Sequence, residues 1–176
     1  MKKLLSLLAV CLAISFLSSC GYSTRSLLPG NIKTIHIAPF KNKIIYATEN
    51  TKNVYLPLLE VKIRNAVANR FLFDGRLHVQ GSETADLVLK GELIGYERDP
   101  LRYTDNNDVL EYRIHIVVSL ELWDPVQGKA LWSEPNFVGE TTYFPTGVLA
   151  KSESAALEDA LTDLARRIVE RTIEDW

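Results

Sequence analysis

Cysteine is almost missing from this chain of 176 residues, which has two, Cys11 and Cys20. Both lie near the N-terminus, so the stretch from Gly21 to Trp176 contains no thiol. This excludes a disulfide, a thiolate metal site and a cysteine nucleophile from that stretch. It is long enough to bury a core of its own, so we expect its stability to come from packing alone.

The chain also lacks an excess of positive charge. It carries 20 lysines and arginines against 22 aspartates and glutamates, a formal net charge of −2. Removal of Lys2 and Lys3 with a cleaved N-terminal segment makes the balance more negative still. Nucleic-acid-binding domains are usually basic, so we expect no nucleic-acid partner.

Motifs of known catalytic centres are missing as well. There is no HExxH, no Gly-x-Ser-x-Gly, no phosphate-binding loop and no dinucleotide-binding glycine fingerprint. His36, His78 and His115 each stand alone in an expected strand, without a partner at metal-ligand spacing. Asp105 and Asp108 lack the glycine and the distant glutamate of an EF-hand calcium loop. We therefore expect a protein that is not an enzyme, with no catalytic residue and no metal.

Long apolar runs are confined to the N-terminus. Lys2 and Lys3 precede a nearly unbroken apolar stretch over residues 4–17. It is shorter than the ~20 residues that a membrane-spanning helix needs. A basic start, an apolar core and small residues at its end are typical of a cleavable export signal. An ordinary secretion signal, in which Cys20 is no more than a small residue, also fits this pattern.

The tetrapeptide Leu17-Ser18-Ser19-Cys20 closes the segment and resembles the bacterial lipobox. In lipoproteins the cysteine thiol receives a diacylglycerol, the chain is cut just before it, and the new amine is acylated. The resemblance implies that residues 1–19 are a lipoprotein signal peptide and that Cys20 carries the covalent lipid. More than one acyl chain gives stable anchoring. Gly21, in place of aspartate, implies the outer membrane, with the protein facing the periplasm.

Residues 20–30 have little periodicity and are expected to form a tether, followed by one domain over residues 31–176. Alternating apolar and polar residues predict extended segments at 32–38, 77–79, 86–96, 111–123, 129–133 and 137–144. Helical spacing predicts one helix from near Val54, capped by Asn53, to Asp74-Gly75 and another after Ser152. This order predicts an α+β fold, with two helices packed on one face of a mixed, mainly antiparallel sheet of about four strands.

Two segments carry a resemblance to a known family. The first is Cys20-Gly21-Tyr22, followed by Leu28-Pro29 and by the strand over residues 32–38 with Pro39-Phe40-Lys41-Asn42 after it. The second is the order of elements, with Glu111-Tyr112-Arg113 opening the longest strand and a helix at the C-terminus. Together they resemble the LPS-assembly lipoprotein family, LptE, over nearly all of the chain after Cys20. A strand followed by Pro-Phe-x-Asn also opens other envelope lipoprotein domains.

The resemblance implies a role and two partners. LptE-like proteins plug the large outer-membrane β-barrel LptD, assist its assembly, and help deliver lipopolysaccharide to the outer leaflet. The alternative is an envelope lipoprotein that activates or scaffolds another periplasmic machine, of the curli-secretion or penicillin-binding-protein activator type. Neither role requires a cofactor beyond the lipid on Cys20.

Arginine and lysine are the side chains best suited to bind the phosphates of lipopolysaccharide. Arg98 and Arg102 lie beside tyrosines in an expected connection, and Lys129 follows a hairpin turn. The corresponding family region is basic and is implicated in lipopolysaccharide contact, which favours Arg102. The candidate lipopolysaccharide-binding residues are therefore Arg98, Arg102 and Lys129. Glu97, Asp99 and Asp105 could neutralise the first two.

Overall fold

A computed structural model describes residues 32–46, 53–81 and 84–174 of the chain. The expected signal peptide, Cys20 and the tether lie outside these residues. The elements, in chain order, are β1 (Thr34–Ile37), β2 (Lys41–Asn42), α2 (Leu59–Asp74), β3 (His78–Gln80), β4 (Leu87–Tyr103), β5 (Val109–Asp124), β6 (Lys129–Tyr143) and α3 (Glu153–Glu174). Neither of these helices combines the length and the apolar character needed to cross a membrane.

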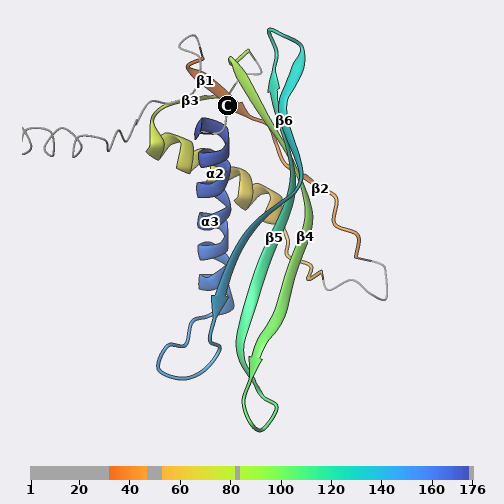
Figure 1. Cartoon of the computed structure of the whole chain (residues 1–176), viewed down its shortest axis with the longest axis vertical. Coiled ribbons are helices and arrows are strands. Elements are labelled where there is room, and N and C mark those ends of the chain that lie inside the picture. Colours follow the sequence, from red (N-terminus) through yellow and green to blue (C-terminus); the bar gives the residue numbers. More distant parts are fainter. Residues whose placement is uncertain (1–31, 47–52, 82–83, 175–176) are drawn as a thin grey trace, which may run out of the picture.

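The predicted α+β class is confirmed, and α2 and α3 lie against the same face of the sheet (Figure 1). Within the described residues the sheet has six strands rather than about four, in the order β3-β1-β4-β5-β6, with β2 beside β4. Its short strands pair in parallel, whereas β4, β5 and β6 form an antiparallel meander. Strand β2 was not among the predicted strands, because it is a pair of exposed polar residues with no apolar alternation to mark it.

Alternation along β5 decides which face the helices cover. The buried set is Ile114, Ile116, Val118, Leu120 and Leu122, while the residues between them are half-buried. The buried set packs against α3, whose predicted apolar stripe is confirmed: Ala156, Ala160, Leu161, Leu164, Ile168 and Val169 are all buried. We call the opposite face of the sheet, which carries no helix among the described residues, the open face.

The start of α2 differs from the prediction, but its end does not. The helix begins at Leu59, after Leu58 in a left-handed conformation (φ 59°), and Asn53 does not cap it. Asn53 instead bridges Glu97 of β4, and its Oδ1 accepts a hydrogen bond from Tyr96 N at 3.0 Å. The helix stops as predicted at Gly75, whose positive φ of 75° suits glycine.

One carboxylate fixes the start of β1, the first strand of the sheet. Asp86 Oδ2 accepts hydrogen bonds from Lys33 N (2.9 Å), Thr34 N (2.9 Å) and Thr34 Oγ1 (2.8 Å). The Lys33 amide, followed by the Thr34 hydroxyl, lowers the pKa of Asp86 below its ordinary 3.8. The ionised side chain therefore ties the start of β1 to the start of β4.

Helix α3 lies close over β6 because of one glycine. A Cβ at Gly139 would lie 2.3 Å from Leu164 Cβ and 2.7 Å from Leu164 Cα. At this crossing Arg167 Nη1 donates to the Val138 carbonyl, and Asp163 Oδ2 accepts from Glu140 N at 3.2 Å. Side chains of α3 thus satisfy backbone groups of β6, which is an edge strand of the sheet.

Strand β4 runs further than predicted. It continues to Tyr103 through Pro100, where we expected a connection to begin. Proline is tolerated on strands with a free edge, since its missing N–H can face away from the partner strand. The β4–β5 hairpin therefore projects beyond the helices (Figure 1). We call residues 98–112, with their turn, the hairpin end.

Candidate functional site

Arg98 lies on the helix-covered face of the hairpin end, where β4 meets the start of α3. Its Nη1 donates a hydrogen bond to Glu153 Oε2. Its guanidinium also lies over the Tyr112 ring, with Cζ 5.0 Å from the ring centroid. Arg98 is thus engaged in joining β4 to the first turn of α3.

Tyrosines surround this ion pair. Tyr96 is buried and donates from its hydroxyl to Glu153 Oε1 at 3.4 Å, and Tyr143 stacks on Tyr112 with centroids 5.6 Å apart. Burial, and after it the nearby charge of Glu153, raises the pKa of Tyr96 to about 12. Burial likewise raises the pKa of Tyr143. Both hydroxyls therefore keep their protons at physiological pH.

Arg102 lies further along the hairpin end and is more open to solvent. Its Nε donates to Glu111 Oε2 at 2.5 Å, and its guanidinium lies 5.6 Å from the centroid of the Phe144 ring. The hydrogen bond from Arg102 is the main reason that the pKa of Glu111 is lowered. The Arg102 side chain is 60% exposed, whereas that of Glu111 is 6% exposed. Because a guanidinium has five N–H donors, Arg102 keeps donors for an anion arriving from solvent.

Lys129 lies at the other end of the sheet. It pairs with Asp124 at the end of β5, whereas Arg102 pairs with Glu111 near its beginning. At about 3.3 Å per residue, these two positions on β5 are about 40 Å apart. The structure therefore places Arg98 and Arg102 at the same end of the sheet, with different partners, and leaves Lys129 at the other end.

The Lys129 end has a hollow of its own on the open face, with a volume of about 730 Å³. Pro39, Lys90 and Trp123 are among the residues that line it. Lys90 Nζ lies 4.2 Å from the centroid of the Trp123 ring and 2.7 Å from Glu121 Oε1. Lys90 in this hollow is thus paired with a carboxylate.

A β-bulge decides which side chains of β4 face the helices. The register shifts between Leu93 and Gly95, so that Tyr96 and Arg98 pair with Ile116 and Ile114 on the helix-covered face. Strict alternation from Leu87 onward would have placed Glu97 and Asp99 on that face. The bulge exchanges the faces of the two pairs of residues, so Glu97 and Asp99 lie on the open face.

The carboxylates that neutralise the arginines are therefore not the expected ones. We expected Glu97, Asp99 and Asp105, whereas Arg98 forms an ion pair with Glu153 and Arg102 forms one with Glu111. The sequence could have indicated Glu111 as a partner of Arg102. The two residues lie nearly the same number of positions from the hairpin turn, one after it and one before it. Glu153 left no such signal, since it comes from a distant helix.

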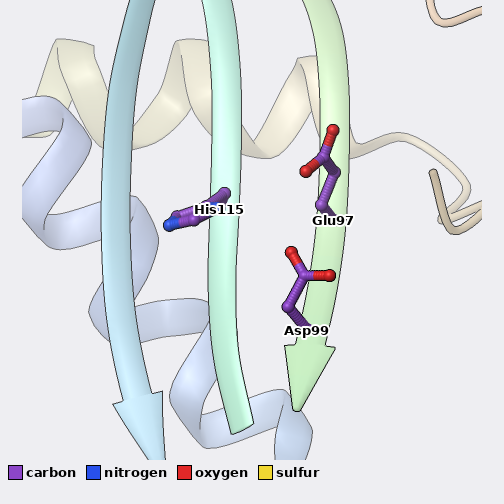
Figure 2. A group of neighbouring side chains, drawn as sticks. All are labelled: Glu97, Asp99 and His115. Carbon is purple, nitrogen blue, oxygen red and sulfur yellow. The ribbon is translucent and has the colours of Figure 1, made fainter. Parts of the chain in front are cut away.

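On the open face, Glu97, Asp99 and His115 lie together, on the two neighbouring strands β4 and β5 (Figure 2). One possible ligand atom from each lies within 4.8 Å of the other two. His115 has no partner at metal-ligand spacing along the sequence, but in the fold two carboxylates lie near it. The carboxylates reach it across strands, through the pairing of Glu97 with His115, and spacing along the sequence did not reveal this.

Comparisons with known proteins agree with this fold. The model of the family described as LptE, lipopolysaccharide-assembly, matches residues 32–172. No curated protein sequence matches the chain.

Solved structures with the same fold share little sequence with this chain. A DUF330 protein from Xanthomonas campestris has a TM-score of 0.59 at 15% identity, covering 84% of this chain and 88% of that one. An uncharacterised lipoprotein B from Nitrosomonas europaea has a TM-score of 0.56 at 14% identity, with coverage of 83% and 88%. A hypothetical protein from Chlamydia trachomatis has a TM-score of 0.51 at 13% identity, with coverage of 80% and 95%.

Proposed function

The chain belongs to the LptE lipopolysaccharide-assembly family, and from that premise we propose that it plugs an LptD-like outer-membrane β-barrel, assists its assembly and helps deliver lipopolysaccharide to the outer leaflet. The family match over residues 32–172 is the observation that carries this proposal. The family consists of non-catalytic lipoproteins, in keeping with the lack of catalytic motifs in the sequence.

A plug has to present polar surface to a polar lumen and hold its shape there. The open face offers such a surface, because the half-buried residues of β5 on it include Arg113, His115, Ser119 and Glu121. The helices cover the aliphatic face, so the core stays closed while the open face contacts water or a partner. These features support a role as a rigid insert in a barrel.

The start of β1 and the hairpin end lie at opposite ends of the sheet. Ile35 pairs with Leu87 at the start of β4, so the chain enters the sheet far from Arg102. At about 3.3 Å per residue, Leu87 and Arg102 are about 50 Å apart along β4. Lipidated Cys20 would hold the domain beside the membrane and so raise its local concentration near a barrel.

The hairpin end supplies the chemistry that a phosphorylated lipid requires. Arg102 presents an exposed guanidinium beside Phe144, and a guanidinium can bind phosphate oxygens in a bidentate manner. Leu101 and Tyr103 on either side of it are exposed, which adds apolar surface next to the cation. We assign the primary lipopolysaccharide contact to Arg102, with Arg98 supporting the strand beneath it.

Crosslinking in intact cells tests the barrel partnership. A photoreactive amino acid is placed at Tyr103 in the hairpin end, at Val126 in the β5–β6 turn, and at Phe73, an exposed residue on α2. We expect irradiation to yield one large outer-membrane β-barrel as an adduct from at least one of these positions. Recovery of only a peptidoglycan synthase or a secretion channel from all three would overturn the proposal.

A further inference from the structure

The open face carries a group of side chains that the proposed plug role does not use. We call Glu97, Asp99 and His115 the open-face triad (Figure 2). Each is half-buried, and the helices lie on the other side of the sheet. The triad is therefore reachable from solvent without any movement of α2 or α3.

We propose that the open-face triad binds one divalent first-row transition-metal ion, such as Zn²⁺, through two carboxylate oxygens and one imidazole nitrogen. Such ligands bind Zn²⁺ at about 2.0–2.2 Å, which places the ligand atoms about 3–4 Å from one another. Separations of up to 4.8 Å need only small side-chain rotations to reach this spacing. Imidazole suits transition metals, whereas Ca²⁺ and Mg²⁺ prefer oxygen ligands throughout.

The backbone beneath the triad is fixed by the sheet. Glu97 and His115 are directly paired across β4 and β5, and β5 is the middle strand of the antiparallel meander. Asp99 follows Glu97 by one strand period and so lies on the same face. Directly opposed residues on one face have Cβ atoms about 5 Å apart, so their side chains can share one ion.

A fourth side chain orients the histidine. Glu140 of β6 pairs with His115, and its Oε2 lies 3.0 Å from His115 Nε2. A carboxylate that accepts the proton of one ring nitrogen leaves the lone pair of the other for a metal, here that of Nδ1. Glu140 thus acts as the orienting carboxylate of a carboxylate–histidine–metal arrangement.

The local charge also suits a cation. Glu97, Asp99 and Glu140 bring three carboxylates to this part of the open face. Arg113, which is paired with Asp99 across the strands, brings one guanidinium. The ion therefore competes with Arg113 for Asp99 but enters a site with an excess of negative charge. When bound, it would tie β4 to β5 where the hairpin leaves the helices.

Calorimetric titration of the full chain, purified in detergent without a histidine tag, with ZnCl₂ tests the proposal. We expect one ion per chain, and affinity at least tenfold weaker in His115→Ala. Loss of an orienting carboxylate typically costs 10–100-fold in affinity, so Glu140→Gln should weaken binding about tenfold. The matched control is His78→Ala, an exposed histidine on β3, which should bind like the unmodified chain. Co²⁺ should give visible absorption bands in both the unmodified chain and His78→Ala.

Equal affinity of His115→Ala and His78→Ala, or no stoichiometric binding by the unmodified chain, would overturn the proposal. Circular dichroism shows whether His115→Ala is folded. Should it unfold, Glu97→Gln and Asp99→Asn take its place, because both keep the shape of the side chain. Unchanged affinity in both of these folded variants would equally overturn the site.

Discussion

Beneath α2 and α3 the sheet turns a row of aliphatic side chains toward the helices, whereas at the hairpin end the same face carries Arg98 and Tyr112. In the first region shape depends on close packing, and in the second on ion pairs and ring contacts. Packing tolerates little change in volume, while partly exposed ion pairs contribute little to stability. Substitutions in the covered region should therefore cost stability, and those at the hairpin end should cost binding.

The largest effect is expected at Gly139, in the covered region. Its missing Cβ leaves room for Leu164 of α3, so Gly139→Ala forces the helix away from β6. We expect the free energy of unfolding in urea to fall by about 3 kcal/mol. Gly81→Ala is the matched control, because a Cβ there meets nothing within 4 Å. A fall of similar size in both variants would contradict the close approach of α3.

The next effect is expected at Asp86, where the covered region begins. Asp86→Ala removes the acceptor of three hydrogen bonds, so we expect a loss of about 2 kcal/mol at pH 7. The pKa of Asp86 is lowered in the folded chain, so its contribution is present above the unfolded pKa near 4. It disappears as the pH falls through the lower folded value.

Thermal unfolding of Asp86→Ala and of the unmodified chain between pH 7 and pH 2.5 measures this dependence. The difference between the two should be constant from pH 7 to about pH 5 and should shrink below about pH 4. A difference that stays the same down to pH 2.5 would mean that the Asp86 charge does not hold β1.

The smallest effect on stability, with the clearest effect on binding, is expected at Arg102. Arg102→Gln keeps an N–H donor for Glu111 but removes the charge, so the free energy of unfolding should change by less than about 0.5 kcal/mol. Loss of one charge-assisted contact should weaken lipopolysaccharide binding about tenfold. Lys62→Gln, at an exposed ion pair with Glu158, is the control and should bind normally. Equal losses in both variants would remove Arg102 from the contact.

The covered region was largely predictable from sequence and the hairpin end was not. The alternation from Tyr112 to Leu122 predicts which side chains of that strand are buried, and the helical spacing from Ala156 to Val169 does the same for the helix. Buried residues recur every second position in a strand and about every 3.6 positions in a helix. The bulge after Leu93 left a faint trace, since Leu89 and Leu93 are followed by Tyr96 rather than by an apolar residue at position 95 or 97. That trace was not enough to predict on which face of the sheet Glu97 and Arg98 lie.

What could not be predicted depends on contacts between distant segments. Asn53 resembles a helix cap in sequence, but in the structure it bridges β4. Glu153 resembles an ordinary first-turn acid of α3, but it accepts hydrogen bonds from both Tyr96 and Arg98. The group around His115 requires the register of two strand pairs, which no local pattern supplies. Site geometry here follows from strand register, which is set by the fold as a whole.

The side chains of α3 that reach β6 also bear on how this protein meets its surroundings. Arg167 and Asp163 occupy the carbonyl of Val138 and the amide of Glu140, groups that an incoming strand would need. At this crossing the sheet cannot be lengthened by a strand from a second copy or from an unfinished barrel. Association along this stretch has to proceed through side chains, which protects this part of the edge from strand-to-strand aggregation.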